Sequence, residues 1–373
     1  MQRISRPPRI NWQQSVESQG MAYHTIDDEP YWDETACYRF DGAEIDLLED
    51  ATNELQERCI EAAQHVIDKD LFDKLQIPPH AVPLIVDSWE RDEPSLYGRF
   101  DLAYDGHTPP KLLEYNADTP TSLLEASVIQ WFWLKDLYPD ADQFNSIHER
   151  LIEAWKGMRI GSTVHFSCVA DAPEDFGNLE YLRDTAIQAG LTTSQLFMND
   201  IGFEEVAGRF VDLEDRPIDL MFKLYPWEWL VNEYFGRKLA TARMRLIEPA
   251  WKMLLSNKGL LAIMWELFEG HENLLRAGFE AGPFRDNYVT KPLLSREGEN
   301  VTVHRNGQVH EVEGSYGGKA PVYQQLAQIP CFDGNYPVIG SWIVAGESAG
   351  IGIREDRQLV TTNASRFVPH YFN

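Results

Sequence analysis

Apolar side chains recur every three to four residues between Ile45 and Leu75, which is the spacing of one face of an amphipathic helix. The same periodicity predicts further helices elsewhere in the chain. They cover residues 122–137, 146–158, 178–190, 233–242 and 259–275. Helices therefore account for much of the first three quarters of the chain.

Short runs rich in β-branched and aromatic residues predict strands. They cover residues 83–89, 98–105, 111–118 and 162–170. The turn GHTPP joins the second run to the third, so these two strands are expected to form a hairpin. The last hundred residues are short β-rich runs separated by glycines. Together these patterns predict a mixed α/β or α+β fold with functional loops over a sheet.

Composition narrows the class of protein. The chain has 373 residues, of which 43% are hydrophobic and 25% charged, as in globular proteins. Its net charge of −26 disfavours nucleic acid and anionic membranes as partners, although the charge alternatively serves only to maintain solubility. No apolar run is long enough to cross a bilayer. The four cysteines show no CxxC spacing and the N-terminus has no apolar signal core, so a cytoplasmic location is expected.

Most common catalytic motifs are absent from the sequence, but one decoy is present. Residues 346–350 read GESAG and match the GxSxG nucleophile elbow around Ser348. Such an elbow must open a helix, whereas the residues that follow are β-like, and only His370 lies downstream as a base. A serine hydrolase is therefore the weaker alternative, and Ser348 is better interpreted as part of a hairpin tip.

The predicted hairpin carries the first candidate chemistry. Arg99 and Asp101 are two residues apart on one strand, and Glu114 and Asn116 are two apart on the next. Each pair therefore shares a face of its strand. If the faces match, two carboxylates and an amide oxygen converge, a ligand set that suits Mg²⁺. The alternative is a solvated polar face on an edge hairpin.

Lys291 is a second candidate, because it ends the strand YVTKP next to the glycine-containing turn SREGEN. A lysine in that position is suited to contact phosphate. No other feature of the spacing separates this role from that of an ordinary surface lysine.

Several segments in order resemble one family. They are GRFD, LLEYNADTPTS, NKGLLAIMWELF, YVTKPLLSREGENV and VYQQL. They are similar to the C-terminal synthetase half of glutathionylspermidine synthase, from about Asn11 to the C-terminus. The resemblance implies an ATP-grasp fold, with ATP held between two lobes. It also implies one synthetase unit over residues 1–373, with the main nucleotide-binding region over 231–373.

The resemblance further implies roles for individual residues. Asp101, Glu114 and Asn116 would bind Mg²⁺, and Arg99 and Arg354 would lie beside the transferred phosphoryl group. The remaining contacts to ATP, besides Arg99 and Asp101, would come from Lys258, Lys291, Glu297, Gly298, Gln324, Gln325, Leu326, Ala327, Leu359, Val360 and Thr361.

The implied reaction is the joining of a carboxylate to an amine through an acyl phosphate made from ATP. The substrates would be a peptide-like acid and a polyamine-like amine, and a homodimer is possible. Glu174 and Asp175 follow a predicted strand and are candidates to hold an ammonium, although a plain solvated loop is an equal alternative. A non-catalytic nucleotide- or polyamine-binding protein is the second functional alternative.

The sequence departs from the family where the acid would bind. Residues 119–122 read TPTS where the glutathione-using synthases have small serine and cysteine residues. Trp229 stands where the family's Trp-Glu-Thr segment has a threonine, and the amidase half has no counterpart here. We therefore expect intact ATP machinery and an altered acid pocket.

Overall fold

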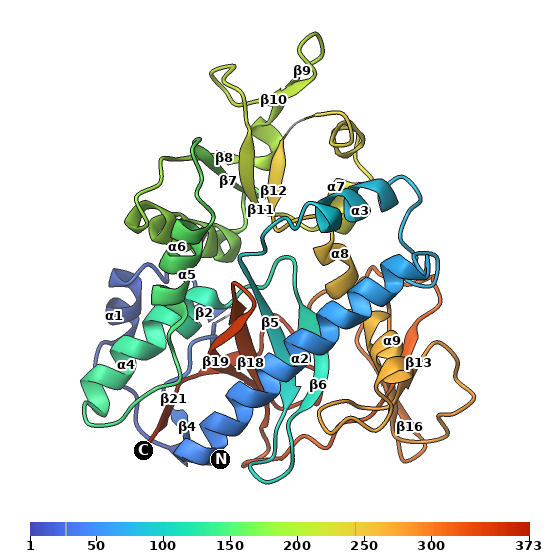
Figure 1. Ribbon diagram of the computed structural model, residues 1–373. Helices are drawn as coiled ribbons and strands as arrows, with labels where there is room; N and C mark the ends of the chain where they lie inside the picture. The colour runs from blue at the N-terminus through green and yellow to red at the C-terminus, as the bar shows by residue number, and fades with distance from the viewer. Residues whose placement is uncertain (27, 243) are drawn as a thin grey trace.

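The computed structural model describes residues 1–26, 28–242 and 244–373. Helices account for 29% of the chain and strands for 27%, which confirms the mixed α/β class. Figure 1 shows the helices and sheets arranged around a central sheet, with both ends of the chain at the bottom of the view. No helix in the described ranges combines the length and apolar character needed to cross a membrane.

The central sheet is antiparallel, with strand order β20-β19-β18-β5-β6. Its strands are β5 (Tyr97–Ala103), β6 (Lys111–Asn116), β18 (Tyr336–Val344), β19 (Glu347–Asp356) and β20 (Arg366–Val368). The predicted hairpin is confirmed as β5–β6, which pairs Arg99 with Asn116 and Asp101 with Glu114. A register shift follows Asp101, where a β-bulge turns the end of the hairpin.

The helix α2 (Gly42–Asp68) crosses one face of the central sheet (Figure 1). Asp41 and Glu44 form a reciprocal capping box at its start, worth about 1 kcal/mol. Its apolar stripe is buried, as the periodicity predicted. The helix ends seven residues before Leu75, because Asp70 adopts a left-handed φ of 52° and turns replace the last predicted helical turn.

A parallel sheet with order β12-β11-β7-β8 forms a second part of the molecule. Helices α5 and α6 pack beside it, and the hairpin β9–β10 projects beyond it at the top of Figure 1. The bounds are β7 (Val164–Cys168), β8 (Thr193–Phe197), β9 (Gly202–Glu204), β10 (Arg209–Val211), β11 (Leu220–Leu224), β12 (Arg245–Ile247), α5 (Ile147–Gly157) and α6 (Pro173–Gln188). This sheet brings α6 and the end of β11 toward the central hairpin.

A third sheet, antiparallel with order β13-β17-β14-β15-β16, packs against helix α9 (Leu260–Leu267). Its strands are β13 (Ala277–Gly278), β14 (Tyr288–Lys291), β15 (Thr302–Arg305), β16 (Gln308–Glu311) and β17 (Val322–Gln325). The loop between β14 and β15 lies over the central sheet. The central sheet and the third sheet thus form the two walls of a cleft.

Smaller elements complete the fold. A three-stranded sheet joins β1 (Gln2–Ser5), β4 (Ala36–Phe40) and β21 (His370–Phe372), so it links both ends of the chain. The remaining elements are α1 (Trp12–Ser18), β2 (Thr25–Ile26), β3 (Glu29–Pro30), α3 (Val82–Glu90), η1 (Glu125–Ile129), α4 (Gln130–Leu137), η2 (Met198–Asp200), α7 (Trp227–Leu230), η3 (Gly236–Lys238) and α8 (Lys252–Leu255).

Besides the first helix, three further predicted elements are wrong or too long. Residues 83–89 form helix α3 instead of a strand, with Pro83 in the first turn, where its missing N–H costs nothing. A short apolar run does not by itself distinguish a strand from a helix. Residues 233–242 form turns and one short 3₁₀ helix, because Phe235 packs its ring against the β9–β10 hairpin. Helix α9 ends at Leu267, not at residue 275.

Candidate active site

The hairpin β5–β6 places its four polar side chains in one cluster. The Arg99 Nε atom lies 2.8 Å from Asp101 Oδ1, and Arg354 Nη2 lies 2.9 Å from Asp101 Oδ2. On the neighbouring strand, Asn116 Nδ2 donates to Glu114 Oε1 at 3.3 Å. The predicted convergence of one cation and three oxygen-bearing side chains is therefore present, and Arg354 joins it from β19.

Two lysines neutralise Glu114. Lys258 Nζ lies 3.2 Å from Glu114 Oε2. Burial opposes ionisation of Glu114, but Lys258, Lys291 and Arg99 outweigh it and lower its pKa to about 2. Burial lowers the pKa of Lys291 to about 8, although Glu114 and Asp101 favour its charged form. The cluster is a buried arrangement of alternating charges, not a solvated hairpin face.

The oxygen ligands fit a magnesium ion. Asp101, Glu114 and Asn116 offer hard oxygen donors from two adjacent strands, and cations are the partners of both carboxylates. Mg²⁺ is usually bound by one or two carboxylates together with phosphates and water. Within the described ranges, no group of three or more His, Cys, Asp and Glu side chains forms a separate metal site. The hairpin is thus the place where the donor chemistry suits a divalent cation.

A largely apolar cavity adjoins this cluster, on the side of the third sheet. Its walls include Val289, Val301, Val303, Ile329 and Val338. The predicted ATP and metal contacts that line it are Asp101, Glu114, Lys291, Gly298, Gln324, Gln325, Leu326, Ala327, Leu359, Val360 and Thr361. We refer to it as the nucleotide cavity. Gln324 was expected to contact ATP, but its side chain accepts a hydrogen bond from Lys291 Nζ at 2.8 Å and donates one to Leu112 O at 2.9 Å. Gln324 therefore holds the lysine in place.

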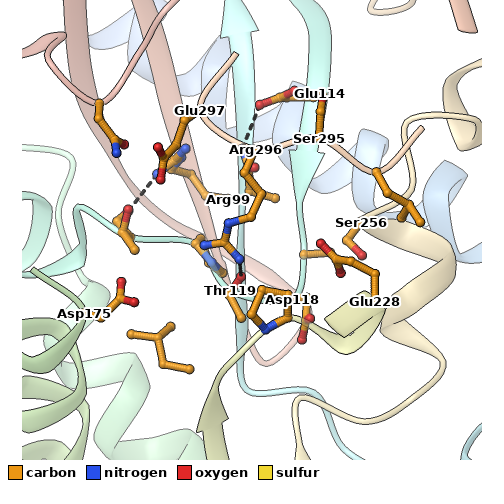
Figure 2. Close-up of a pocket in the computed structure, with 18 of the residues that line it drawn as sticks. Arg99, Glu114, Asp118, Thr119, Asp175, Glu228, Ser256, Ser295, Arg296 and Glu297 are labelled. Carbon is orange, nitrogen blue, oxygen red and sulfur yellow. Dashed lines mark hydrogen bonds between the residues drawn. The ribbon is translucent and has the colours of Figure 1, made fainter. Parts of the chain in front are cut away.

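A second, larger cavity opens on the other side of Glu114, and Figure 2 shows it. Of the predicted residues it is lined by Arg99, Glu114, Asn116, Glu174, Asp175, Lys258, Glu297, Gly298, Arg354 and Thr361. We refer to it as the substrate cavity. The two cavities share Glu114, Gly298 and Thr361. They therefore meet at the charged cluster.

Gly298 makes this junction possible. Its φ is +74°, and a Cβ atom there would lie 2.6 Å from Thr361 O and 2.8 Å from Val360 Cγ1. A larger residue would force the loop after β14 away from residues 359–361, which form a bend after β19 rather than the strand expected there. The loop that carries Gly298, one of the predicted contacts to ATP, is thus in close contact with the far wall of the nucleotide cavity.

Arg296 is a cavity residue that sequence reasoning did not single out. Its Nη1 atom donates to Thr119 Oγ1 at 2.7 Å, and its guanidinium lies 5.7 Å from the centre of the Trp229 ring. Figure 2 shows Arg296 directed across the cavity toward Thr119. The signal was available, because Arg296 stands immediately before Glu297 in the loop SREGEN.

Asp118 was also missed as a functional position, although it lies inside the quoted motif. Lys223 Nζ donates to its Oδ1 at 2.6 Å, and the backbone N–H of Trp227 donates to its Oδ2 at 2.7 Å. Asp118 therefore holds the start of the short helix α7. That helix carries Glu228 and Trp229 to the cavity wall.

Glu174 and Asp175 do not lie on a loop. They form the first turn of α6 and line the substrate cavity, so the solvated-loop alternative is wrong. Burial raises the pKa of both carboxyls. Glu228 faces the same cavity, and burial raises its pKa as well. The cavity thus brings together three carboxyl groups, and none of them forms an ion pair within the described part of the chain.

The structure contradicts the serine hydrolase alternative. Ser348 is only 1% exposed and lies inside strand β19, which continues for eight more residues where an elbow would open a helix. The turn between β18 and β19 is formed by residues 345 and 346, so Ser348 is not in the hairpin tip either. His370 bonds Gln130, and burial lowers its pKa to about 3. Neither side chain is placed for nucleophilic attack.

Comparison with known proteins first defines the class. The structure matches that of a glutathione synthetase-like effector (GSS30) from Globodera pallida, with a TM-score of 0.58 over 99% of this chain and 98% of that one. The sequence identity is 11%, so the match concerns the fold alone. The expected ATP-grasp fold of the glutathione synthetase type is confirmed.

The family follows from the sequence. Residues 3–373 match the model described as "Glutathionylspermidine synthase preATP-grasp", and the chain belongs to this family. A Haemophilus influenzae protein named "Putative acid--amine ligase" is 46% identical, with 98% of each chain covered. The trypanothione synthetase of Crithidia fasciculata is 30% identical over 84% of this chain. The Escherichia coli bifunctional glutathionylspermidine synthetase/amidase is 28% identical over 88% of it.

The chain spans 53% and 58% of the lengths of the last two relatives. It matches the Haemophilus protein over nearly the whole length of both. All three relatives are named as ligases or synthetases, and the chain is an enzyme of the ligase class.

Proposed function

We propose that the chain is an ATP- and Mg²⁺-dependent acid–amine ligase that forms an amide through an acyl phosphate. The observation that carries this proposal is the junction of two unlike cavities at one charged cluster. The nucleotide cavity is apolar and ends at Lys291 and Glu114, whereas the substrate cavity is polar and acidic. A phosphoryl group at the junction would lie between a nucleotide and a carboxylate.

The protein's own contribution is placement and charge. A bound Mg²⁺ would be held by Asp101, Glu114 and Asn116 and would neutralise phosphate charge. Lys291 would hold phosphate oxygens from the nucleotide cavity, and Lys258 would hold them from the substrate cavity. Arg99 and Arg354 face the substrate cavity and would stabilise the transferred group. In this scheme ATP and the acid give an acyl phosphate and ADP, and the amine then displaces phosphate.

Two surfaces would exclude water from this step. Gly298 lies against Val360 and Thr361 in the wall of the nucleotide cavity, and the loop that carries Gly298 would cover the bound phosphates. Arg296 closes toward Thr119 over the substrate cavity. Exclusion of water protects an acyl phosphate from hydrolysis.

We further propose a single synthetase unit over residues 1–373. Residues 231–373 supply most of the nucleotide cavity, while Asp101, Leu113 and Glu114 enter it from the central hairpin. The nucleotide-binding region therefore draws on both parts of the chain.

The substrate cavity supports a cationic amine and an acid other than glutathione. Glu174, Asp175 and Glu228 would attract an ammonium group. Arg296 is the candidate to hold a carboxylate of the acid. Trp229 narrows the wall beside Arg296, so the pocket differs from the one that the family's threonine would line.

The test is a panel of acids crossed with amines, scored by phosphate release from ATP and by amide formation in mass spectra. We expect Mg²⁺-dependent release with a diamine or polyamine, and a weak response to glutathione. Amide formation only with neutral amines would contradict the cationic site. ATP binding without turnover for any pair would instead favour a non-catalytic binding protein.

A further inference from the structure

Glu125 is a buried carboxyl that has no part in the mechanism above. It begins the π-helical turn η1, its side chain is 0% exposed, and it lies nine residues beyond Asn116. Among the residues described, neither of its carboxylate oxygens has a hydrogen-bond partner. An unpartnered carboxylate in such a place is costly, and π-helical turns are frequent at functional sites.

The element that carries Glu125 is joined directly to the substrate cavity. The Asn178 side chain accepts a hydrogen bond from Leu123 N at 2.9 Å and donates one to Glu174 O at 2.9 Å. The turn of Glu125 is thereby tied to the first turn of α6. Ser122, just before this turn, has a φ of +66°, a strained conformation for a residue other than glycine.

Two tyrosines, Tyr23 and Tyr31, lie near Glu125. Tyr31 bonds Ser122 Oγ at 2.9 Å, and Tyr23 packs against α6 so closely that a Cβ at Gly177 would lie 2.8 Å from its ring. Their hydroxyl groups are weak acids that remain neutral here, because burial raises both tyrosine pKa values. A tyrosine side chain is neutral or anionic and never positive, so neither of them supplies a counter-charge to Glu125.

Two influences favour the neutral form of Glu125, whereas the hydroxyl groups of Tyr31 and Tyr23 favour its charged form. Burial is the larger of the two and the Glu174 carboxylate the next, and the net result is a pKa of Glu125 raised to about 8. Glu174 in turn faces Asp175, Glu297 and Arg354. Only Arg354 in this set is cationic, and it already pairs with Asp101. Two carboxyls thus share one region with no cation of their own.

We propose that Glu125 holds a proton in the amine-free protein and releases it when a cationic amine binds beside Glu174. The exchange is balanced: one ammonium charge enters, and the Glu125 O–H bond breaks with its proton leaving to solvent by way of Glu174. The positive charge of the amine is then balanced by Glu125 as well as by Glu174, although only Glu174 lines the cavity. This inference rests on the proposed cationic amine site, and it makes Glu125 a positioning residue that acts through Glu174.

The proposal predicts a particular pH dependence of amine affinity. Below a pH of about 8 the proton must be displaced, so affinity for 1,4-diaminobutane should rise about tenfold per pH unit between pH 6 and pH 8. Above that range the proton has already left, and affinity should level off. In Glu125→Gln the rise from pH 6 to pH 8 should be lost.

Infrared difference spectroscopy gives a direct readout. The amine-free protein at pH 7 should show the C=O band of a protonated carboxyl, and saturating 1,4-diaminobutane should remove it. The Glu125→Gln variant should lack this amine-dependent change and keep its fold, because glutamine copies the neutral carboxyl. Glu248→Gln is a matched control, since Glu248 is equally buried but is paired with Lys252 away from both cavities.

The outcomes separate cleanly. Loss of the band in the wild type and in Glu248→Gln, but not in Glu125→Gln, supports the proposal. An unchanged band at saturating amine, or the same change in Glu125→Gln, overturns it. Glu174→Gln gives a second test, because removal of its charge should lower the pH at which Glu125 ionises. Failure of the ligase function alone would appear as absent amide formation with this proton exchange intact.

Discussion

The nucleotide cavity and the substrate cavity are neighbours with opposite character. The first has apolar walls, and its charges are confined to one end, where each carboxylate has a basic partner. The second is lined by carboxylates from separate elements, with Arg296, Arg99, Arg354 and Lys258 as cations. This contrast suits the proposed roles, in which the first cavity holds the nucleotide and the second holds the acid and the amine.

The largest effect on activity is expected at the charged cluster where the two cavities meet. Asp101→Asn should reduce ATP turnover about a thousand-fold, because it removes a proposed metal ligand and the partner of Arg99 and Arg354. Phosphate release measures it, with thermal unfolding to confirm the fold. Asp105→Asn, on the exposed turn of the same hairpin, is the control and should retain turnover. Activity within tenfold of wild type in Asp101→Asn would remove the hairpin from the mechanism.

The nucleotide cavity alone is tested by Lys291→Ala. Loss of a charge-assisted contact of about 2 kcal/mol should weaken ATP binding roughly thirty-fold. Calorimetric titration of ATP and Mg²⁺ measures the change. Ser348→Ala should bind ATP as the wild type does, because Ser348 lies outside both cavities. Equal ATP affinity in Lys291→Ala would show that this end of the cavity does not hold phosphate.

The substrate cavity is tested by Trp229→Thr, which restores the family's residue. We expect KM for a tripeptide acid to fall about tenfold while the KM for ATP stays constant, since the indole is removed from one wall only. Steady-state kinetics with several acids provide the measurement. Phe132→Ala removes a similarly exposed aromatic ring from α4 and should change neither constant. A parallel change in both constants would mean that the two cavities are not separable.

The smallest effect concerns the carboxyl behind the substrate cavity. Glu125 has a folded-state pKa of about 8 against an ordinary value of 4.5. The stability that its protonated form contributes is fully present below pH 4.5 and is lost as the pH rises through about 8. Glu125→Gln should therefore raise the free energy of unfolding more at pH 8 than at pH 4, because glutamine stays neutral at both pH values. Denaturant unfolding at both pH values measures this, and equal gains would contradict it.

Sequence reasoning was most successful where residues that act together are close along the chain. The hairpin could be predicted because Arg99 and Asp101, like Glu114 and Asn116, repeat at the two-residue period of a strand. The nucleotide cavity followed from short motifs within a family resemblance. Strand periodicity and short motifs can be interpreted from neighbouring residues alone, before the fold is known.

The substrate cavity could not be predicted in the same way. Glu174 comes from α6, Glu228 from α7 and Arg296 from the loop after β14, and only tertiary packing brings them together. Their separation in sequence gives no periodic signal. Glu125 was likewise hidden, because a polar residue within an apolar helical run is normally interpreted as an exposed position.

The attachment of helix α7 has a consequence for how new specificities arise. A single buried carboxylate, Asp118, anchors the start of this helix through Lys223 and the backbone of Trp227. The anchor is independent of the side chains at Glu228 and Trp229. If the substrate cavity binds the acid as proposed, these two positions can be exchanged together without disturbing the charged cluster at the hairpin, and one scaffold can be adapted to different acids.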